Sequence, residues 1–141
     1  MKMSEIQEQI IEEFSLLEDW MDKYNYLIEL GKELPAIDEK FKTDEYLIRG
    51  CQSKVWLNVE EKDGILHFTA DSDAIITKGI VSLLIKAITG RTPDEIVETE
   101  LYFIDKIGLK ENLSPTRANG LVAMVKQMKL YAIAYREKLK G

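Results

Sequence analysis

The chain has 141 residues, a formal net charge of −6 at pH 7, 45% hydrophobic and 31% charged residues. Its length fits one domain over residues 1–141, and its composition excludes collagen-like, low-complexity and disordered proteins. The acidic charge argues against nucleic acid as a partner, because phosphate backbones are bound by basic surfaces. The first residues carry acids where a secretory signal needs an apolar core, and no apolar run reaches the roughly 18 residues of a membrane span. We therefore expect a cytoplasmic protein that makes no membrane contact.

Two amphipathic helices are predicted at the start of the chain. Ser4 and Gln7 have the spacing of a capping box, and apolar residues recur at helical spacing over residues 6–17. A second apolar stripe follows Asp19, and we expect Gly31 to end that helix as a C-cap. The aromatic residues in these stripes are typical of core packing.

The middle of the chain changes to period two and predicts a small antiparallel sheet. Three runs fit strands: residues 46–48, 53–60 and 65–70. Asp63-Gly64 lies between the last two runs, and both residues tolerate the positive φ of a hairpin turn. We expect a three-stranded meander.

Helices are predicted again after the sheet. Residues 74–89 are apolar on more than one side, as in a buried helix, and Gly90 follows them. Thr92-Pro93 opens a short helix, an apolar segment follows, and Ser114-Pro115 opens the last helix. The predicted fold is α+β, with about five or six helices covering one face of the three-stranded sheet.

Cys51 is the only cysteine, so disulfides, C-x-x-C redox pairs, zinc knuckles and iron–sulfur cages built by this chain alone are excluded. Gly50 beside it permits a sharp turn that exposes the sulfur, and Arg49 offers a charge that favours a thiolate. A lone cysteine is more often a small buried hydrophobe, so this signal by itself is weak.

Residue counting tests whether Cys51 has a catalytic histidine. If Asp63-Gly64 is a two-residue turn, His67 lies opposite Glu60, nine residues from Cys51. At about 3.3 Å per residue the separation is roughly 30 Å. A cysteine–histidine pair is therefore excluded, and His67 is predicted to lie on the surface of a strand.

The same counting brings residues 71–74 back to the level of residues 51–54. Asp73 and the start of the helix at Ala74 are therefore expected near the thiol. The helix N-terminus favours a thiolate and the carboxylate opposes it, so the direction of the thiol pKa shift stays open. Asp73 fits an N-cap equally well. Because the chain has no second thiol, reachable histidine, metal cluster or phosphate loop, what remains is a carrier that holds a transferred group on Cys51.

Four segments spread over nearly the whole chain form one recognisable pattern: Phe14-Ser15-Leu16-Leu17-Glu18-Asp19-Trp20, Gly50-Cys51-Gln52-Ser53-Lys54-Val55-Trp56-Leu57, Asp71-Ser72-Asp73-Ala74 with Lys78-Gly79, and Leu113-Ser114-Pro115-Thr116-Arg117 with Asn119-Gly120-Leu121. In their order and spacing these segments resemble the SufE/CsdE family of sulfur acceptors in iron–sulfur cluster assembly.

The resemblance implies a fold like that of the cluster scaffold protein, known as the SufE/IscU fold, without that protein's three ligand cysteines. Cys51 would accept sulfane sulfur from the persulfide of a pyridoxal-phosphate-dependent cysteine desulfurase of the SufS/CsdA type and pass it to an iron–sulfur scaffold complex. It implies that the acceptor stimulates the desulfurase and is a carrier and not an enzyme, with no cofactor or metal of its own.

The resemblance further implies that the cysteine loop lies against the domain when free and swings outward to meet the desulfurase. Gly50, Gln52, Asp73 and Arg117 would support that loop. Arg117 falls in the first turn of the last helix, where a cation is unfavourable, so a role near Cys51 would explain it; an ordinary surface ion pair is the alternative.

Two other functions stay open at this level. One is a single-cysteine redox sensor or thiol peroxidase, in which Cys51 is oxidised to a sulfenic acid. The other is a binding module with an inert, buried Cys51. The sequence also leaves open which desulfurase is the partner and whether the protein acts as a monomer or a homodimer.

Overall fold

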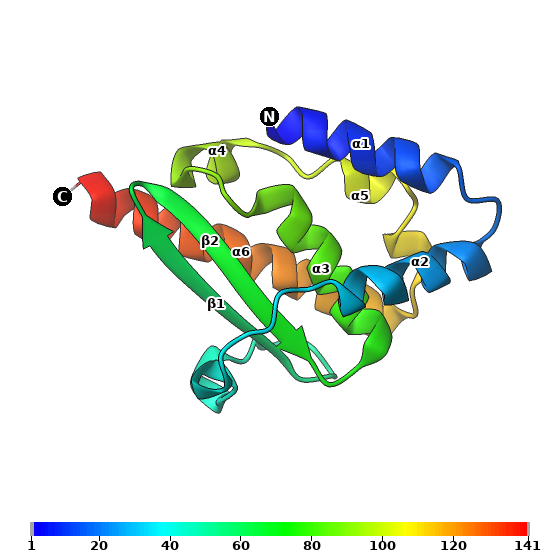
Figure 1. Ribbon diagram of the computed structural model, residues 1–141, viewed down its shortest axis with the longest axis horizontal. Helices are drawn as coiled ribbons and strands as arrows, with labels where there is room; N and C mark the ends of the chain where they lie inside the picture. Colours follow the sequence, from blue (N-terminus) through cyan, green and yellow to red (C-terminus); the bar gives the residue numbers. More distant parts are fainter. Residues whose placement is uncertain (1, 141) are drawn as a thin grey trace.

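The computed structural model describes residues 2–140, in which six α-helices and a two-stranded antiparallel sheet form an α+β fold (Figure 1). The helices and strands in chain order are α1 (Met3–Ser15), α2 (Trp20–Lys32), β1 (Val55–Lys62), β2 (Ile65–Ser72), α3 (Ile75–Ile88), α4 (Pro93–Glu98), α5 (Phe103–Lys106) and α6 (Pro115–Lys140), with 3₁₀ turns η1 (Glu39–Phe41), η2 (Asp44–Tyr46) and η3 (Lys110–Asn112). Within the described range, no helix has the length and apolar character needed to cross a membrane.

The hairpin has the predicted register. Lys62 pairs with Ile65, and the turn residues Asp63 and Gly64 have φ values of 54° and 81°. These positive φ values fit the right-handed twist of the two strands, which explains why this dipeptide fixes the pairing. The register therefore continues without a bulge to Val55 opposite Ser72.

The predicted third strand is not confirmed. Tyr46 ends η2, and the following residues contribute one isolated bridge, Leu47 with Trp56, together with a 2.9 Å hydrogen bond from Ile48 N to Val55 O. The chain then turns at Gly50, where φ is +94°. The chain therefore leaves the sheet edge after two residues, which is too short for a strand.

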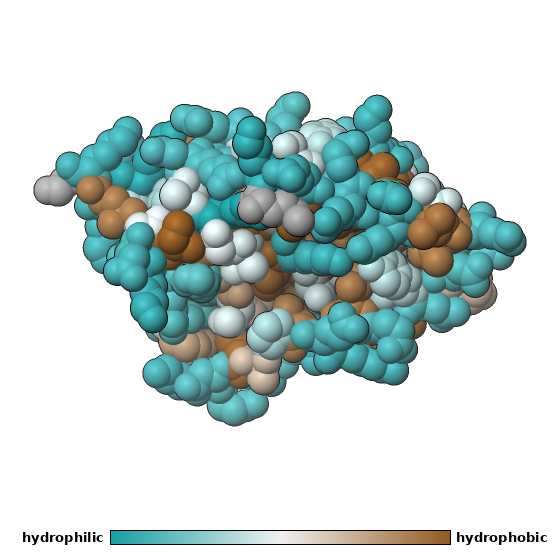
Figure 2. Space-filling model, turned by 45° about the horizontal axis from the view of Figure 1, so that its top comes forward, coloured by the Kyte–Doolittle hydropathy of each residue, from teal (hydrophilic) through white to brown (hydrophobic). Residues whose placement is uncertain are grey.

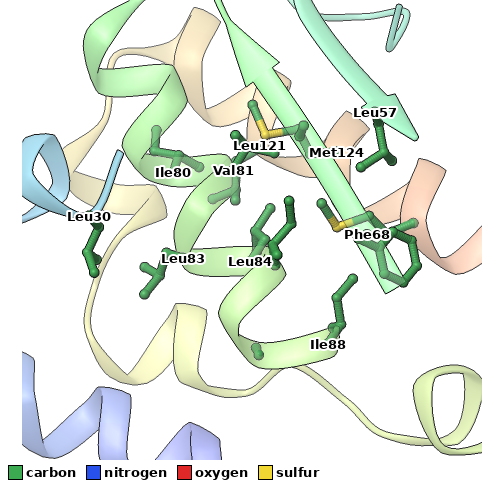
Figure 3. Close-up of a cluster of buried hydrophobic side chains, with 14 of the residues drawn as sticks. Leu30, Leu57, Phe68, Ile80, Val81, Leu83, Leu84, Ile88, Leu121 and Met124 are labelled. Atoms are coloured by element: carbon green, nitrogen blue, oxygen red, sulfur yellow. The ribbon is translucent and has the colours of Figure 1, made fainter. Parts of the chain in front are cut away.

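Helix α3 lies at the centre of the core, between the sheet and the N-terminal helices (Figures 1 and 3). Its side chains are buried on several sides, which confirms the prediction from its apolar pattern. Figure 3 shows Leu57 and Phe68 of the strands and Leu121 and Met124 of α6 on one side of α3, and Leu30 of α2 on the other. Each such buried side chain contributes about 1.5–3 kcal/mol relative to exposure, so α3 holds the layers together.

Helices α2 and α3 approach each other closely at two glycines. A Cβ on Gly79 would lie 2.2 Å from the carbonyl oxygen of Leu27, and a Cβ on Gly31 would lie 3.0 Å from Gly79 N. The prediction that Gly31 caps α2 is wrong, because the helix continues through Lys32. Gly31 lacks a side chain here because a neighbouring helix occupies the space, not because the chain must turn.

The predicted helix starts are partly confirmed. Asp19 accepts a hydrogen bond from Asp22 N at 2.9 Å, and Thr92 accepts one from Glu95 N at 3.2 Å, as N-caps do. The predicted capping box of Ser4 with Gln7 is wrong, because Lys2 is the N-cap and α1 begins at Met3, two residues before the start that a cap at Ser4 requires. Gln7 is buried instead, and its amide bonds the backbone of the α4–α5 region, at Glu100 O and Phe103 N.

The surface carries several separate apolar groups. Figure 2 shows a largely hydrophilic face on which apolar atoms form small areas. The large apolar side chains that are exposed lie on four helices and their ends: Leu16, Met21, Ile75, Val122, Leu130, Ile133 and Leu139.

Candidate functional site: the Cys51 segment and its pocket

Residues 49–53, the Cys51 segment, connect the single bridge at Leu47 to β1. They lie at the open end of the hairpin, next to the start of α3 (Figure 1). Hydrogen bonds fix both ends of the segment: Ile48 N to Val55 O at 2.9 Å, and Asp73 N to Lys54 O at 3.2 Å. Between these ends, the described residues give the segment one hydrogen bond to the rest of the protein, which comes from Cys51. The segment is thus held firmly at its ends and weakly in its middle.

Cys51 is half-buried against α6. Its Sγ donates to the carbonyl oxygen of Gly120 at 3.6 Å, and a Cβ on Gly120 would lie 3.5 Å from that sulfur. Gly50 permits this contact, because its φ of +94° suits glycine and because a Cβ there would lie 3.1 Å from Ala123 Cβ. Burial raises the pKa of the Cys51 thiol above its ordinary value. In this conformation the sulfur is therefore protonated and a poor nucleophile at neutral pH.

A pocket of about 300 Å³ lies beside the thiol. Three segments far apart in sequence form its wall: the Cys51 segment, the first turns of α3 and the first turns of α6. Its lining residues are Cys51, Gln52, Ser53, Thr77, Ile80, Ser114, Thr116, Arg117, Gly120 and Met124. We call it the thiol pocket; its wall holds four hydroxyl groups, one guanidinium group and no acidic side chain.

Gln52 and Arg117 both line the thiol pocket, so the structure places these two residues beside Cys51. Arg117 lies in the first turn of α6, where its N–H donates to Ser114 Oγ at 3.3 Å. Its guanidinium group forms no ion pair or hydrogen bond with the residues the structure describes, so the surface ion pair considered as an alternative is not present among them. A cation without a protein partner therefore lies in the same wall as the thiol.

Asp73 holds the end of the Cys51 segment and does not line the pocket. Its Oδ1 accepts from Lys54 N at 3.0 Å, and its own N–H donates to Lys54 O. Counting had placed these residues at the same level, which is confirmed. The N-cap interpretation is wrong: Ala74 occupies the N-cap position of α3, and no side chain caps that end. The carboxylate of Asp73 accepts from the backbone next to the start of β1, and it does not cap α3.

The remaining charged groups near the hairpin lie away from the sulfur. His67 is exposed and pairs with Glu60 in the sheet, which confirms that it cannot act on Cys51. Arg49 is exposed and does not line the thiol pocket. Asp71, near the end of β2, forms ion pairs with Lys42 at 2.7 Å and with Lys78 at 3.3 Å.

Sequence reasoning missed seven lining residues: Ser53, Thr77, Ile80, Ser114, Thr116, Gly120 and Met124. Gly120 and Thr116 fall inside quoted motifs, but only the tertiary contact with Cys51 gives them a role. Thr77 had a weak signal, as a polar residue in an otherwise apolar helix start, and it is buried. Ser53 and Ser114 also fall inside quoted motifs, whereas Ile80 and Met124 had no signal. Spacing along one chain gives no information on which helix faces lie across a pocket.

A larger, mainly apolar pocket of about 440 Å³ lies on the other side of the same turns of α6, against the α4–α5 segment. It contains no thiol. Its most buried cation is Lys129, whose amine donates to the carbonyl oxygens of Ile96 and Thr99, and burial lowers the pKa of that amine. This lysine satisfies carbonyl groups at the end of α4, and the only cysteine of the chain lines the other pocket, the thiol pocket.

Comparison with known proteins gives a consistent result. Residues 8–132 match the family model described as "SufE: Fe-S metabolism associated domain". An uncharacterised SufE-like protein of Rhizobium etli is 42% identical over 127 residues, which cover 86% of this chain and 86% of that protein. A second, from Synechocystis, is 39% identical over 90% of this chain and 80% of that protein.

Two further matches extend the comparison. SufE-like protein 1, chloroplastic/mitochondrial, of Arabidopsis thaliana is 37% identical over 89% of this chain, but the match covers 34% of that longer protein. The solution structure of a hypothetical protein from Thermus thermophilus superposes with a TM-score of 0.76 over 96% of this chain and 97% of that one, at 20% identity. The latter match establishes the fold.

Proposed function

Because the chain belongs to the SufE family, whose domain is associated with Fe–S metabolism, we propose that Cys51 accepts sulfane sulfur from the persulfide of a cysteine desulfurase. The carrier then passes the sulfur to an iron–sulfur scaffold complex. The desulfurase, which is the pyridoxal-phosphate enzyme, makes the reactive sulfur, and this chain only carries it. Removal of that sulfur frees the desulfurase cysteine for another cycle, so the carrier stimulates its partner.

The observation that carries this proposal is the state of the chain's only thiol. Cys51 is half-buried, lies on a segment whose middle makes one hydrogen bond to the rest of the described protein, and lines a pocket whose single charged group is Arg117. A carrier needs a thiol that can be both shielded and presented. The single hydrogen bond in the middle of the Cys51 segment supports movement of the thiol toward a partner protein, and the pocket supports shielding of the thiol from other reactants.

Burial links access and reactivity at Cys51. Desolvation raises the thiol pKa in the closed conformation, so moving the segment outward removes that cause and increases the thiolate fraction. The thiolate then attacks the outer sulfur of the desulfurase persulfide, the S–S bond breaks, and its electron pair stays on the desulfurase cysteine. No oxidant or reductant is consumed, because the sulfur moves without a net change in electrons.

The loaded segment returns to the thiol pocket in this proposal. The persulfide anion then faces Arg117 and the hydroxyl groups of the wall, which favour a negative charge, and α6 shields it from other thiols. We propose that the transfer takes place in the cytoplasm, because a carrier that depends on one free thiol needs a reducing compartment.

The redox-sensor alternative is less well supported. A peroxide-reactive cysteine needs a thiolate in the free protein, whereas burial raises the pKa of Cys51. Consumption of peroxide by the isolated protein would favour that alternative.

The test is to incubate the full chain with a SufS-type cysteine desulfurase and free cysteine, and to measure intact mass under non-reducing conditions. We expect a gain of one sulfur atom on Cys51, its absence in Cys51→Ser, and faster cysteine turnover in the presence of the wild-type chain. An unmodified Cys51, or equal loading of Cys51→Ser, would contradict the proposal.

A further inference from the structure

The thiol pocket is larger than a persulfide requires. Its volume of about 300 Å³ is at the lower end of the range for small-molecule sites. One water takes up about 30 Å³ in the liquid, so a single terminal sulfur atom fills only a small part of this space. A molecule of several non-hydrogen atoms fits beside Cys51.

The wall of the pocket favours an anion. Arg117 is its only charged residue, and its guanidinium group has no partner among the residues the structure describes. Ser53, Thr77, Ser114 and Thr116 add hydroxyl groups, and no carboxylate competes for the cation. The planar guanidinium group suits a carboxylate, which it binds through two parallel hydrogen bonds.

Cys51 and Arg117 line the same pocket, so a matching ligand carries a sulfur-reactive group at one end and a carboxylate at the other. We propose that the thiol pocket binds a low-molecular-weight thiol that carries a carboxylate, and that this thiol takes the sulfane sulfur from Cys51. The carboxylate lies at Arg117 and the sulfur at Cys51. The transfer step rests on the proposed function, whereas binding of the carboxylate end does not.

The transfer balances without an external electron source. The thiolate of the small molecule attacks the outer sulfur of the Cys51 persulfide, and a new S–S bond forms. The old S–S bond breaks, its electron pair remains on Cys51 Sγ, and that sulfur takes up a proton. The small molecule leaves as a persulfide, and the carrier returns to its free thiol.

The pocket can be tested without a desulfurase, through thiol–disulfide exchange at Cys51. The reduced full chain is treated separately with 3,3′-dithiodipropionate, which carries carboxylates, and with bis(2-hydroxyethyl) disulfide, which is uncharged. The rate of each mixed disulfide is measured by intact mass. Both reagents meet the same thiolate fraction, so the ratio of the two rates does not depend on the thiol pKa.

Two matched variants remove one positive charge each. Arg117→Gln removes the cation that lines the pocket, and Arg49→Gln removes an exposed cation two residues from Cys51 that does not line it. We expect the dicarboxylate to be favoured about tenfold more in the wild type than in Arg117→Gln, because a charge-assisted pair is lost. Arg49→Gln should keep the wild-type ratio.

Two outcomes would overturn the assignment. One is a rate ratio in the wild type equal to that of Arg117→Gln. The other is an equal fall of the ratio in Arg49→Gln, which would show a general charge effect and not a pocket.

The transfer step is tested on protein loaded by the desulfurase. Loss of the extra sulfur is followed with 3-mercaptopropionate and with 2-mercaptoethanol, in the wild type and in Arg117→Gln. A carboxylate preference that disappears in the variant supports the inference. Equal unloading overturns the transfer while leaving the proposed function intact. A chain that shows selective exchange but never loads sulfur keeps the binding site and overturns the proposed function.

Discussion

Two contacts between neighbouring elements differ in how closely their atoms approach. Where α2 meets α3, the backbones are so close that a Cβ on Gly79 would lie 2.2 Å from Leu27 O. Where the Cys51 segment meets α6, a Cβ on Gly120 would lie 3.5 Å from Cys51 Sγ, an ordinary contact. The first contact is a rigid part of the core. The second is an ordinary van der Waals contact between the half-buried Cys51 and the surface of α6.

The largest expected effect is on the rigid contact. Gly79→Ala forces α2 away from α3 and should lower the free energy of unfolding by about 3 kcal/mol, because overpacking a closely packed interface strains the backbone. Gly120→Ala is the matched control: its methyl group fits, and alanine is favoured over glycine in a helix by up to about 1 kcal/mol. Urea unfolding of both variants measures the difference. Similar losses would show that the two contacts are equally tight.

The next effect tests release of the segment. Gly50→Ala places a methyl group 3.1 Å from Ala123 Cβ at a φ of +94°, and we expect the segment to move off α6 while the core stays folded. Alkylation of Cys51 should then be about tenfold faster, since roughly 1.4 kcal/mol of strain shifts an equilibrium by that factor.

Gly64→Ala is the matched control for strain alone. Its φ is +81° and nothing lies within 4 Å of the added methyl group. It should lower stability by about 1 kcal/mol and leave the alkylation rate of Cys51 unchanged. An increase in alkylation in both variants, or in neither, would contradict a weakly held segment.

The smallest effect is on pH dependence. Burial raises the pKa of the Cys51 thiol, so the alkylation rate of the native chain should titrate above the ordinary thiol value of 9.0, and in urea it should return to that value. Because the folded-state pKa is the higher one, the associated stability is fully present below the unfolded pKa and is lost as pH rises through the folded pKa. Cys51→Ser should lack this alkaline loss. A native titration below 9.0 would show that the thiol is not desolvated.

The hairpin and the N-cap of α4 were predictable because they depend on neighbouring residues. Asp63-Gly64 fixes the register through backbone φ, and Thr92 caps α4 through a hydroxyl group three residues from its donor. The third strand was not predictable in this way. Residues 46–48 have strand-like side chains, but the turn at Gly50 removes the length that pairing needs.

The residues alone pointed to Cys51, the family resemblance added Gln52 and Arg117, and the structure places all three in the wall of the thiol pocket. The opposite case is Gly31, whose place near the end of a helix predicted a cap although a close contact with Gly79 explains it. Asp73 was placed at the correct level by counting, but its partner is a backbone N–H of Lys54 and not the end of α3. Local spacing gives position along an element; it does not give the neighbour across a contact.

The sequence alone determined the α+β order, the hairpin register and the presence of a single thiol, because each depends on local dihedral preferences or on residue identity. Only the tertiary structure decided that this thiol is half-buried, that its pKa is raised, and that Arg117 and four hydroxyl groups lie around it. The physical reason is that these properties depend on packing between residues 51–53, the start of α3 and the start of α6. Their separation in the chain exceeds the range over which local rules act.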